Sequence, residues 1–207
     1  MTANRRLTAA AGAALLAAIV AELATLAHLG TLLSVHVFVG VLMAGPLTVK
    51  LGSTGWRFAR YYAGSPAYVR EGPPPLALRM LAPVLVASTV AVIGTGFALV
   101  VTGPARPGPF VALHVISFLV WMPAIAVHVL AHVRQVPRLI AKGRTPSAVT
   151  LAALAAGAVA GLLLSPVAAP WTAWMDTAEA PGAAFIVVGL VLAALGLLAG
   201  LPLKLKW

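Results

Sequence analysis

The chain has 207 residues, of which 61% are hydrophobic and only 9% are charged, and it contains no cysteine. A soluble domain of this size could not bury so much apolar surface in one core, so lipid has to be the solvent for most of it. Without cysteine there are no disulfides, no thiolate metal sites and no covalent c-type haem attachment. The formal net charge of +10 would point to nucleic acid only if the positions of the charges had no other explanation.

Six apolar runs reach the length of about 20 residues that a helix needs to cross the hydrocarbon core. A bilayer interior tolerates no unpaired backbone, and the runs show no strand-like alternation, so each run is predicted to be a helix. The predicted fold class is an all-α polytopic membrane protein, a six-transmembrane-helix bundle that forms a single transmembrane domain over residues 1–207. The predicted spans are residues 7–28, 31–50, 79–102, 110–133, 147–165 and 183–203, with a cytoplasmic loop over 51–78.

The basic residues predict how these helices are oriented. Thirteen of the fourteen lie before the first run, between the second and third, after the fourth or after the sixth, and only Arg106 lies on the other side. Positive charge stays on the cytoplasmic face, so both termini are predicted to be inside. The same distribution explains the net charge, and no nucleic-acid partner is expected.

The first run has a second interpretation as a cleaved signal peptide, because Arg5 and Arg6 precede an apolar stretch that is followed by small residues. The run is long for a signal peptide, contains Glu22 and leads directly into the second run. A retained helix is therefore favoured. Cleavage would leave five spans with the same orientation.

Glycines four residues apart occur in the last two runs, as Gly157 and Gly161 in GAVAG and as Gly196 and Gly200 in GLLAG. Small faces of this kind let helix backbones approach closely. Both helices are therefore predicted to pack tightly against neighbours.

Three histidines lie in the stretch ALHVISFLVWMPAIAVHVLAHV, residues 112–133, which has no Lys, Arg, Asp or Glu. Placing an ionisable side chain in hydrocarbon costs free energy, so functional roles are expected for His114, His128 and His132. The alternative for any one of them is a neutral histidine that hydrogen-bonds between helices.

His36 in the second run and His114 in the fourth predict a haem site. Each lies four or five residues from the outer end of its run, and the two runs cross in the same direction, so the imidazoles are expected at similar depth. Two neutral imidazoles that face each other across a bundle form an axial pair for a b-type haem iron. Such a haem needs no cysteine.

His128 and His132 lie near the other end of the fourth run. His128 follows His114 by 14 residues, about 21 Å along a helix, and returns within about 40° of the same face. His128 and His132 are one turn apart, so at most one of them can be an axial ligand of an inner haem, and the separation from His114 favours His128. Pro123 lies between the two sites and is expected to kink the helix.

This pattern, with one intramembrane histidine on one helix and two about fourteen residues apart on another, resembles the b-type cytochromes of bacterial respiratory membranes. Haem-carrying ferric-reductase-like membrane subunits are similar. The resemblance covers roughly residues 31–134 and implies that His36, His114 and His128 are the metal-binding axial ligands of haem b, with one haem expected and room for a second. It also implies the bacterial cytoplasmic (inner) membrane, and electron transfer between quinol, or a soluble or peripheral oxidoreductase, and a partner at the membrane surface.

A complete two-haem arrangement would have another histidine fourteen residues after His36, and that position is Lys50. Lysine ligates iron only when it is deprotonated, and it more often extends to the interface. The ligand opposite His128 is therefore not identified.

Glu22, Arg57 and Arg60 are further candidates for residues of a haem site. Glu22 lies near the depth inferred for His36, where a carboxylate can accept the other ring N–H of a ligating histidine. A protonated side chain that bonds to a neighbouring helix is the alternative. Arg57 and Arg60 can pair with the propionates of an inner haem, and positive-inside bias alone also explains them.

The sequence has no serine elbow, no paired carboxylate site and no nucleotide loop. The predicted function is a membrane b-type cytochrome that relays electrons as the membrane subunit of a redox pair, rather than a stand-alone catalyst. The alternative is a permease or copper-handling membrane protein whose histidines, with Met43 and Met122, bind a soft cation. A helix bundle without a cofactor is a third interpretation.

Overall fold

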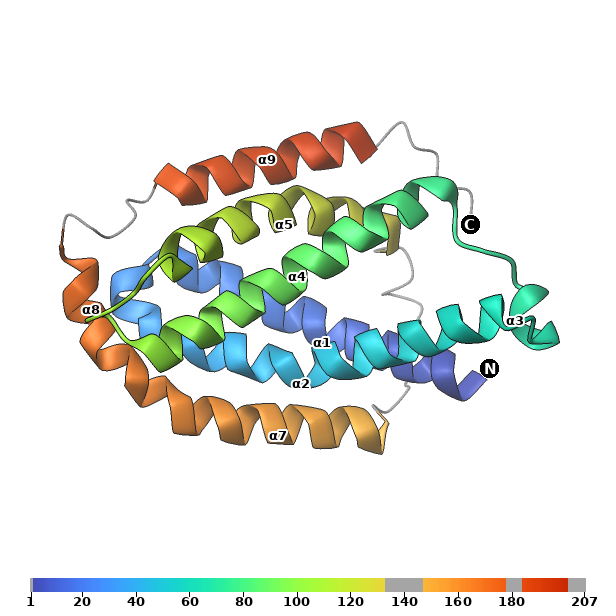
Figure 1. Ribbon diagram of the computed structural model, residues 1–207, viewed down its shortest axis with the longest axis horizontal. Helices are drawn as coiled ribbons and strands as arrows, with labels where there is room; N and C mark the ends of the chain where they lie inside the picture. Colours follow the sequence, from blue (N-terminus) through green and yellow to red (C-terminus); the bar gives the residue numbers. More distant parts are fainter. Residues whose placement is uncertain (1, 133–146, 178–183, 201–207) are drawn as a thin grey trace. The chain divides into compact units, whose positions relative to one another are not determined.

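A computed structural model describes residues 2–132, 147–177 and 184–200, and every regular element in these ranges is helical (Figure 1). The predicted all-α class is confirmed. The elements are α1 (Thr2–Leu26), α2 (Leu29–Tyr62), α3 (Pro66–Val69), α4 (Leu76–Thr102), α5 (Phe110–His132), α7 (Ala148–Leu164), the 3-10 turn η2 (Ser165–Ala168), α8 (Ala169–Met175) and α9 (Ala184–Gly200).

Five helical stretches are long and apolar enough to cross a membrane, so by helix length and hydropathy this is a multi-pass membrane protein. Four of the stretches correspond to α1, α2, α4 and α5, and the fifth, Ala148–Met175, joins α7, η2 and α8. Within the described residues α9 is a shorter apolar helix, and the ends of the predicted run 183–203 lie outside the described ranges. A sixth span therefore stays a prediction.

The largest difference from the predicted boundaries is at the end of α2. The helix continues to Tyr62 rather than ending near residue 50, and the predicted loop over 51–78 is thereby reduced to residues 63–75, which include α3. The backbone ends the helix at Gly64, whose φ of 73° lies in the left-handed region, and Pro66 follows. The apolar run ends earlier than the helix because side chains become polar where the chain leaves lipid. The helix itself can continue into water.

The helices form two compact units. The first comprises Met1–Pro74 and Leu139–Pro166 and contains α1, α2, α3 and α7; the second comprises Pro75–Arg138 and Val167–Trp207 and contains α4, α5, α8 and α9. In the first unit α2 packs against both α1 and α7, and in the second α5 packs against both α4 and α9 (Figure 1). That the two units form a single transmembrane domain stays a prediction.

Glycines bring α7 and α9 close to the central helix of each unit, as predicted. A Cβ atom on Gly157 would lie 2.5 Å from the carbonyl oxygen of Leu42, and one on Gly161 would lie 2.9 Å from that of Phe38. In the second unit a Cβ on Gly196 would lie 2.9 Å from the carbonyl oxygen of Pro123. These contacts are with backbone, which cannot rotate away, so the glycines determine how closely the helices pack.

We expect Gly157→Ala to lower thermal stability, because the added methyl group would push α7 away from α2 at a cost of about 1–3 kcal/mol. Gly94→Ala in α4 is the matched control, since a Cβ there has nothing within 4 Å. Thermal unfolding in detergent, followed by circular dichroism, measures both. Equal melting temperatures for the two variants would contradict the packing role of Gly157.

Candidate functional site

His36 lies in a polar contact between α1 and α2. The turn at residues 27 and 28 reverses the chain, so the last two turns of α1 lie beside the first turns of α2. His36 Nδ1 is 3.0 Å from Glu22 Oε1 and 3.1 Å from Thr25 Oγ1. The His36 and Glu22 side chains are each only 19% exposed. The structure thus brings together two of the predicted site residues, Glu22 and His36.

The hydroxyl of Thr25 indicates which nitrogen of His36 carries the proton. Thr25 Oγ1 donates its one hydrogen to the carbonyl oxygen of Glu22 at 2.6 Å, so toward the imidazole it can only accept. His36 Nδ1–H is therefore the donor, and the lone pair of the ring is on Nε2. The lone pair is present when the ring is neutral, since an imidazolium carries a proton on both nitrogens.

His114 has an equivalent contact in the second unit, between α4 and α5. Its Nδ1 is 3.1 Å from Thr95 Oγ1. The Thr95 hydroxyl donates to the carbonyl oxygen of Ala91 at 2.6 Å, so it accepts from His114 Nδ1–H. The lone pair of His114 is also on Nε2. His36 and His114 thus each have Nδ1 against a threonine hydroxyl on the helix that precedes them.

Two glycines make room for these contacts. A Cβ atom on Gly40, one turn after His36, would lie 3.4 Å from Glu22 Oε1. A Cβ on Gly96 would lie 3.4 Å from Cε1 of His114. Neither glycine has a positive φ, so the backbone conformation does not require glycine at these positions. The space beside Glu22 and beside His114 does.

His128 and His132 form a stacked pair at the end of α5, with ring centroids 4.5 Å apart and an angle of 30° between the ring planes. His132 Nδ1 is 2.8 Å from the carbonyl oxygen of His128. A carbonyl oxygen only accepts, so His132 is protonated on Nδ1. This hydrogen bond lies within α5, and which of the two histidines is a haem ligand stays a prediction.

The predicted basic candidates lie at the opposite end of the first unit from His36. Lys50 Nζ donates to the carbonyl oxygen of Thr8 on α1 at 3.2 Å. Arg57 Nη2 is 3.6 Å from Glu71 Oε2, and Arg60 lies with its guanidinium carbon 5.7 Å from the ring centroid of Trp56. Arg57 therefore already has a carboxylate partner, and a propionate would have to replace it.

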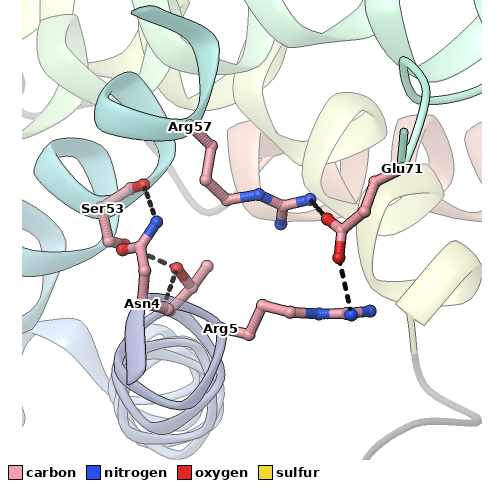
Figure 2. Close-up of polar contacts among 6 residues, drawn as sticks. Asn4, Arg5, Ser53, Arg57 and Glu71 are labelled. Atoms are coloured by element: carbon pink, nitrogen blue, oxygen red, sulfur yellow. Dashed lines mark hydrogen bonds and ion pairs between the residues drawn. The ribbon is translucent and has the colours of Figure 1, made fainter. Parts of the chain in front are cut away.

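Glu71 also binds Arg5, with Arg5 Nη1 2.9 Å from Glu71 Oε1 (Figure 2). One carboxylate thereby joins the start of α1, the later turns of α2 and the segment after α3. Beside it, Asn4 Nδ2 donates to the carbonyl oxygen of Ser53 at 3.1 Å, which fixes the start of α1 against α2 (Figure 2).

Sequence reasoning missed Thr25, Thr95, Gly40, Gly96 and Glu71. The available signal was the presence of a hydroxyl residue on the helix before each histidine, three residues after Glu22 in one case and beside a glycine in the other. Many serines and threonines occur in the apolar runs, however, and spacing along one helix does not show which of them meets a histidine on another.

His36 belongs to the first unit and His114 to the second, so their pairing across one haem stays a prediction. Among the residues described, no three His, Cys, Asp or Glu side chains gather as a metal site. Comparison of the chain with protein-family models, with curated proteins and with solved structures found no match.

Proposed function

We propose that the protein is a membrane b-type cytochrome that relays electrons through a haem with His36 and His114 as axial ligands. The observation that carries this proposal is that the two imidazoles have the same hydrogen-bonding arrangement at Nδ1. Each ring has Nδ1 against a threonine hydroxyl of the preceding helix, and a neutral imidazole that donates Nδ1–H there has its lone pair on Nε2, the nitrogen that a ligand would offer to iron. The donor set therefore fits the group.

The two histidines also sit at similar positions along their helices. His36 is the eighth residue of α2 and His114 the fifth residue of α5, and both helices run away from the same predicted face. Equal depth is a requirement for two ligands of one haem. The orientation, with both termini in the cytoplasm of a bacterial inner membrane, is part of this proposal and follows from the basic residues.

Within this proposal each chain residue has a limited role. Haem b, when bound, supplies one-electron transfer. His36 and His114 would hold it, and Thr25 and Thr95 would keep the two rings in their orientations. Glu22 adds a second acceptor on the His36 side, so the two ligands differ in basicity. Quinol, or a soluble or peripheral oxidoreductase, would exchange electrons with the haem. Arg57 and Arg60 would bind the propionates of an inner haem only if they gave up their contacts with Glu71 and Trp56.

The purified protein tests the proposal directly. We expect a reduced-minus-oxidised absorption spectrum of a low-spin b-type cytochrome and at least one haem per chain by pyridine haemochrome assay. The metal content of the same sample should be measured by elemental analysis. Copper without iron would support the alternative of a permease or copper-handling membrane protein. Colourless protein that takes up no added haemin would contradict the cytochrome.

A second haem at the inner end depends on His128. We expect that, if two haems are present, only His128→Ala reduces the pyridine haemochrome value from two per chain to one, because the 14 residues between His114 and His128 match the separation expected for stacked haems. His132→Ala is the matched control on the same helix. One haem in wild type and in both variants would contradict an inner haem and leave both histidines with structural or proton-carrying roles.

A further inference from the structure

α2 is longer than a bilayer requires. Its 34 residues extend about 51 Å at 1.5 Å per residue, whereas the hydrocarbon core is about 30 Å thick. With the turn before Leu29 at one boundary of the core, the other boundary falls near Lys50. The headgroup layer extends a further 5–8 Å or so on each side, which corresponds to about four or five residues of helix. Trp56 and the residues after it therefore lie at or just beyond headgroup depth.

The end of α2, residues 54–62, presents aromatic and basic side chains; we call this segment the α2 extension. It begins just after Ser53, to which the start of α1 is bonded. Trp56 is 56% exposed, Phe58 66% and Tyr62 62%. From residue 51 to residue 70 the chain has three arginines and no acidic residue. The segment thus combines an apolar surface with positive charge.

The arginines of this region differ in whether their charge is balanced. Glu71 pairs with Arg5 and Arg57 (Figure 2). In the described ranges Arg60 forms no ion pair; it donates to Ser65 Oγ at 3.3 Å and lies against Trp56. Trp56 is one turn closer to the bilayer than Arg60, so this contact keeps the guanidinium beside a side chain at headgroup depth. Long basic side chains extend in this way to reach an interface.

We propose that Trp56 and Arg60 form a binding site for the phosphate group of an anionic phospholipid. The guanidinium supplies a planar set of N–H donors with a net positive charge, and the indole supplies a further N–H donor beside an apolar ring that suits the headgroup boundary. Lipid is the occupant that the position favours, because the site is continuous with a membrane-spanning helix and its cation lies against a tryptophan at headgroup depth. The inference does not depend on the haem.

Native mass spectrometry of the detergent-purified full chain, with dioleoyl phosphatidylglycerol or dioleoyl phosphatidylcholine added, tests the site. We expect wild type to retain phosphatidylglycerol preferentially and Arg60→Gln to lower that preference about fivefold, the effect of one basic residue at an anionic surface. Arg70→Gln is the matched control, an exposed arginine of the same region without the Trp56 contact. An unchanged preference in Arg60→Gln, or an equal loss in Arg70→Gln, would overturn the proposal.

A second measurement separates lipid from a protein that covers the same surface. The chain has no cysteine, so Phe58→Cys provides a single labelling site in the α2 extension. In native membranes we expect a membrane-impermeant maleimide, given access to this side, to label the cysteine equally before and after alkaline carbonate removes peripheral proteins. Labelling that requires the carbonate wash would show a protein on this surface and would overturn the assignment to lipid.

Discussion

Replacement of His36 or His114 by alanine is expected to abolish one b-type haem completely. An axial pair fails when either member is removed, because a six-coordinate low-spin iron needs both nitrogens. The pyridine haemochrome assay measures the loss as haem per chain, and the reduced spectrum measures the loss of the low-spin band. A variant that keeps wild-type stoichiometry and a low-spin spectrum would contradict the ligand assignment.

The two variants differ in their structural consequences, and this difference makes the experiment decisive. His36→Ala removes the partner of Glu22 Oε1 inside the bundle, where the other carboxylate oxygen, Oε2, has no hydrogen-bond partner among the described residues. Loss of haem in that variant could therefore accompany loss of folding. His114→Ala leaves no buried carboxylate behind, and the Thr95 hydroxyl that faces His114 Nδ1 still donates to the carbonyl oxygen of Ala91, so it is the cleaner test.

His28→Ala is the matched control for both variants. His28 lies in the turn between α1 and α2, and its carbonyl oxygen, rather than its side chain, accepts the hydrogen bonds that begin α2. We expect this variant to retain full haem. Size-exclusion chromatography of all three proteins shows whether the fold is intact.

Reporter fusions are expected to give an all-or-none result for orientation. Fusions after residue 65 or 140 should report the cytoplasm, and fusions after residue 105 or 175 should report the external side. The reason is the distribution of the fourteen basic residues, of which only Arg106 lies in an external segment. Alkaline phosphatase is active on the external side of the membrane and green fluorescent protein on the cytoplasmic side. Fusing both reporters at each position therefore gives two independent measurements of its location.

The packing of the helices gives their relative directions within each unit. Gly161 contacts Phe38 and Gly157 contacts Leu42, so α7 runs antiparallel to α2. In the second unit Gly189 contacts Phe118 and Gly196 contacts Pro123, so α9 runs parallel to α5. These directions agree with six alternating spans. A cytoplasmic signal after residue 175 would contradict the six-span arrangement.

The sequence alone determined the fold class and most of the helices. The predicted run 110–133 corresponds to α5 at Phe110–His132, and the run 147–165 to α7 at Ala148–Leu164. The physical reason is local: in lipid each backbone group must be paired within its own segment, so an apolar run of sufficient length is a helix whatever its neighbours are. The same argument failed at the end of α2, because water permits a helix to continue until Gly64 and Pro66 end it.

The proximity of Glu22 to His36 could also be predicted, since a turn between two adjacent spans brings residues of similar depth together. Their partners could not. Thr25 and Thr95 were two hydroxyl residues among many, and Arg57 had two candidate explanations that did not include Glu71. A hydrogen bond between helices depends on the rotation of each helix about its axis and on the small residues that let them approach, such as Gly40 and Gly96. Those rotations are decided by side-chain packing across the whole interface, and so only the tertiary structure determined which threonine faces His36 and which faces His114.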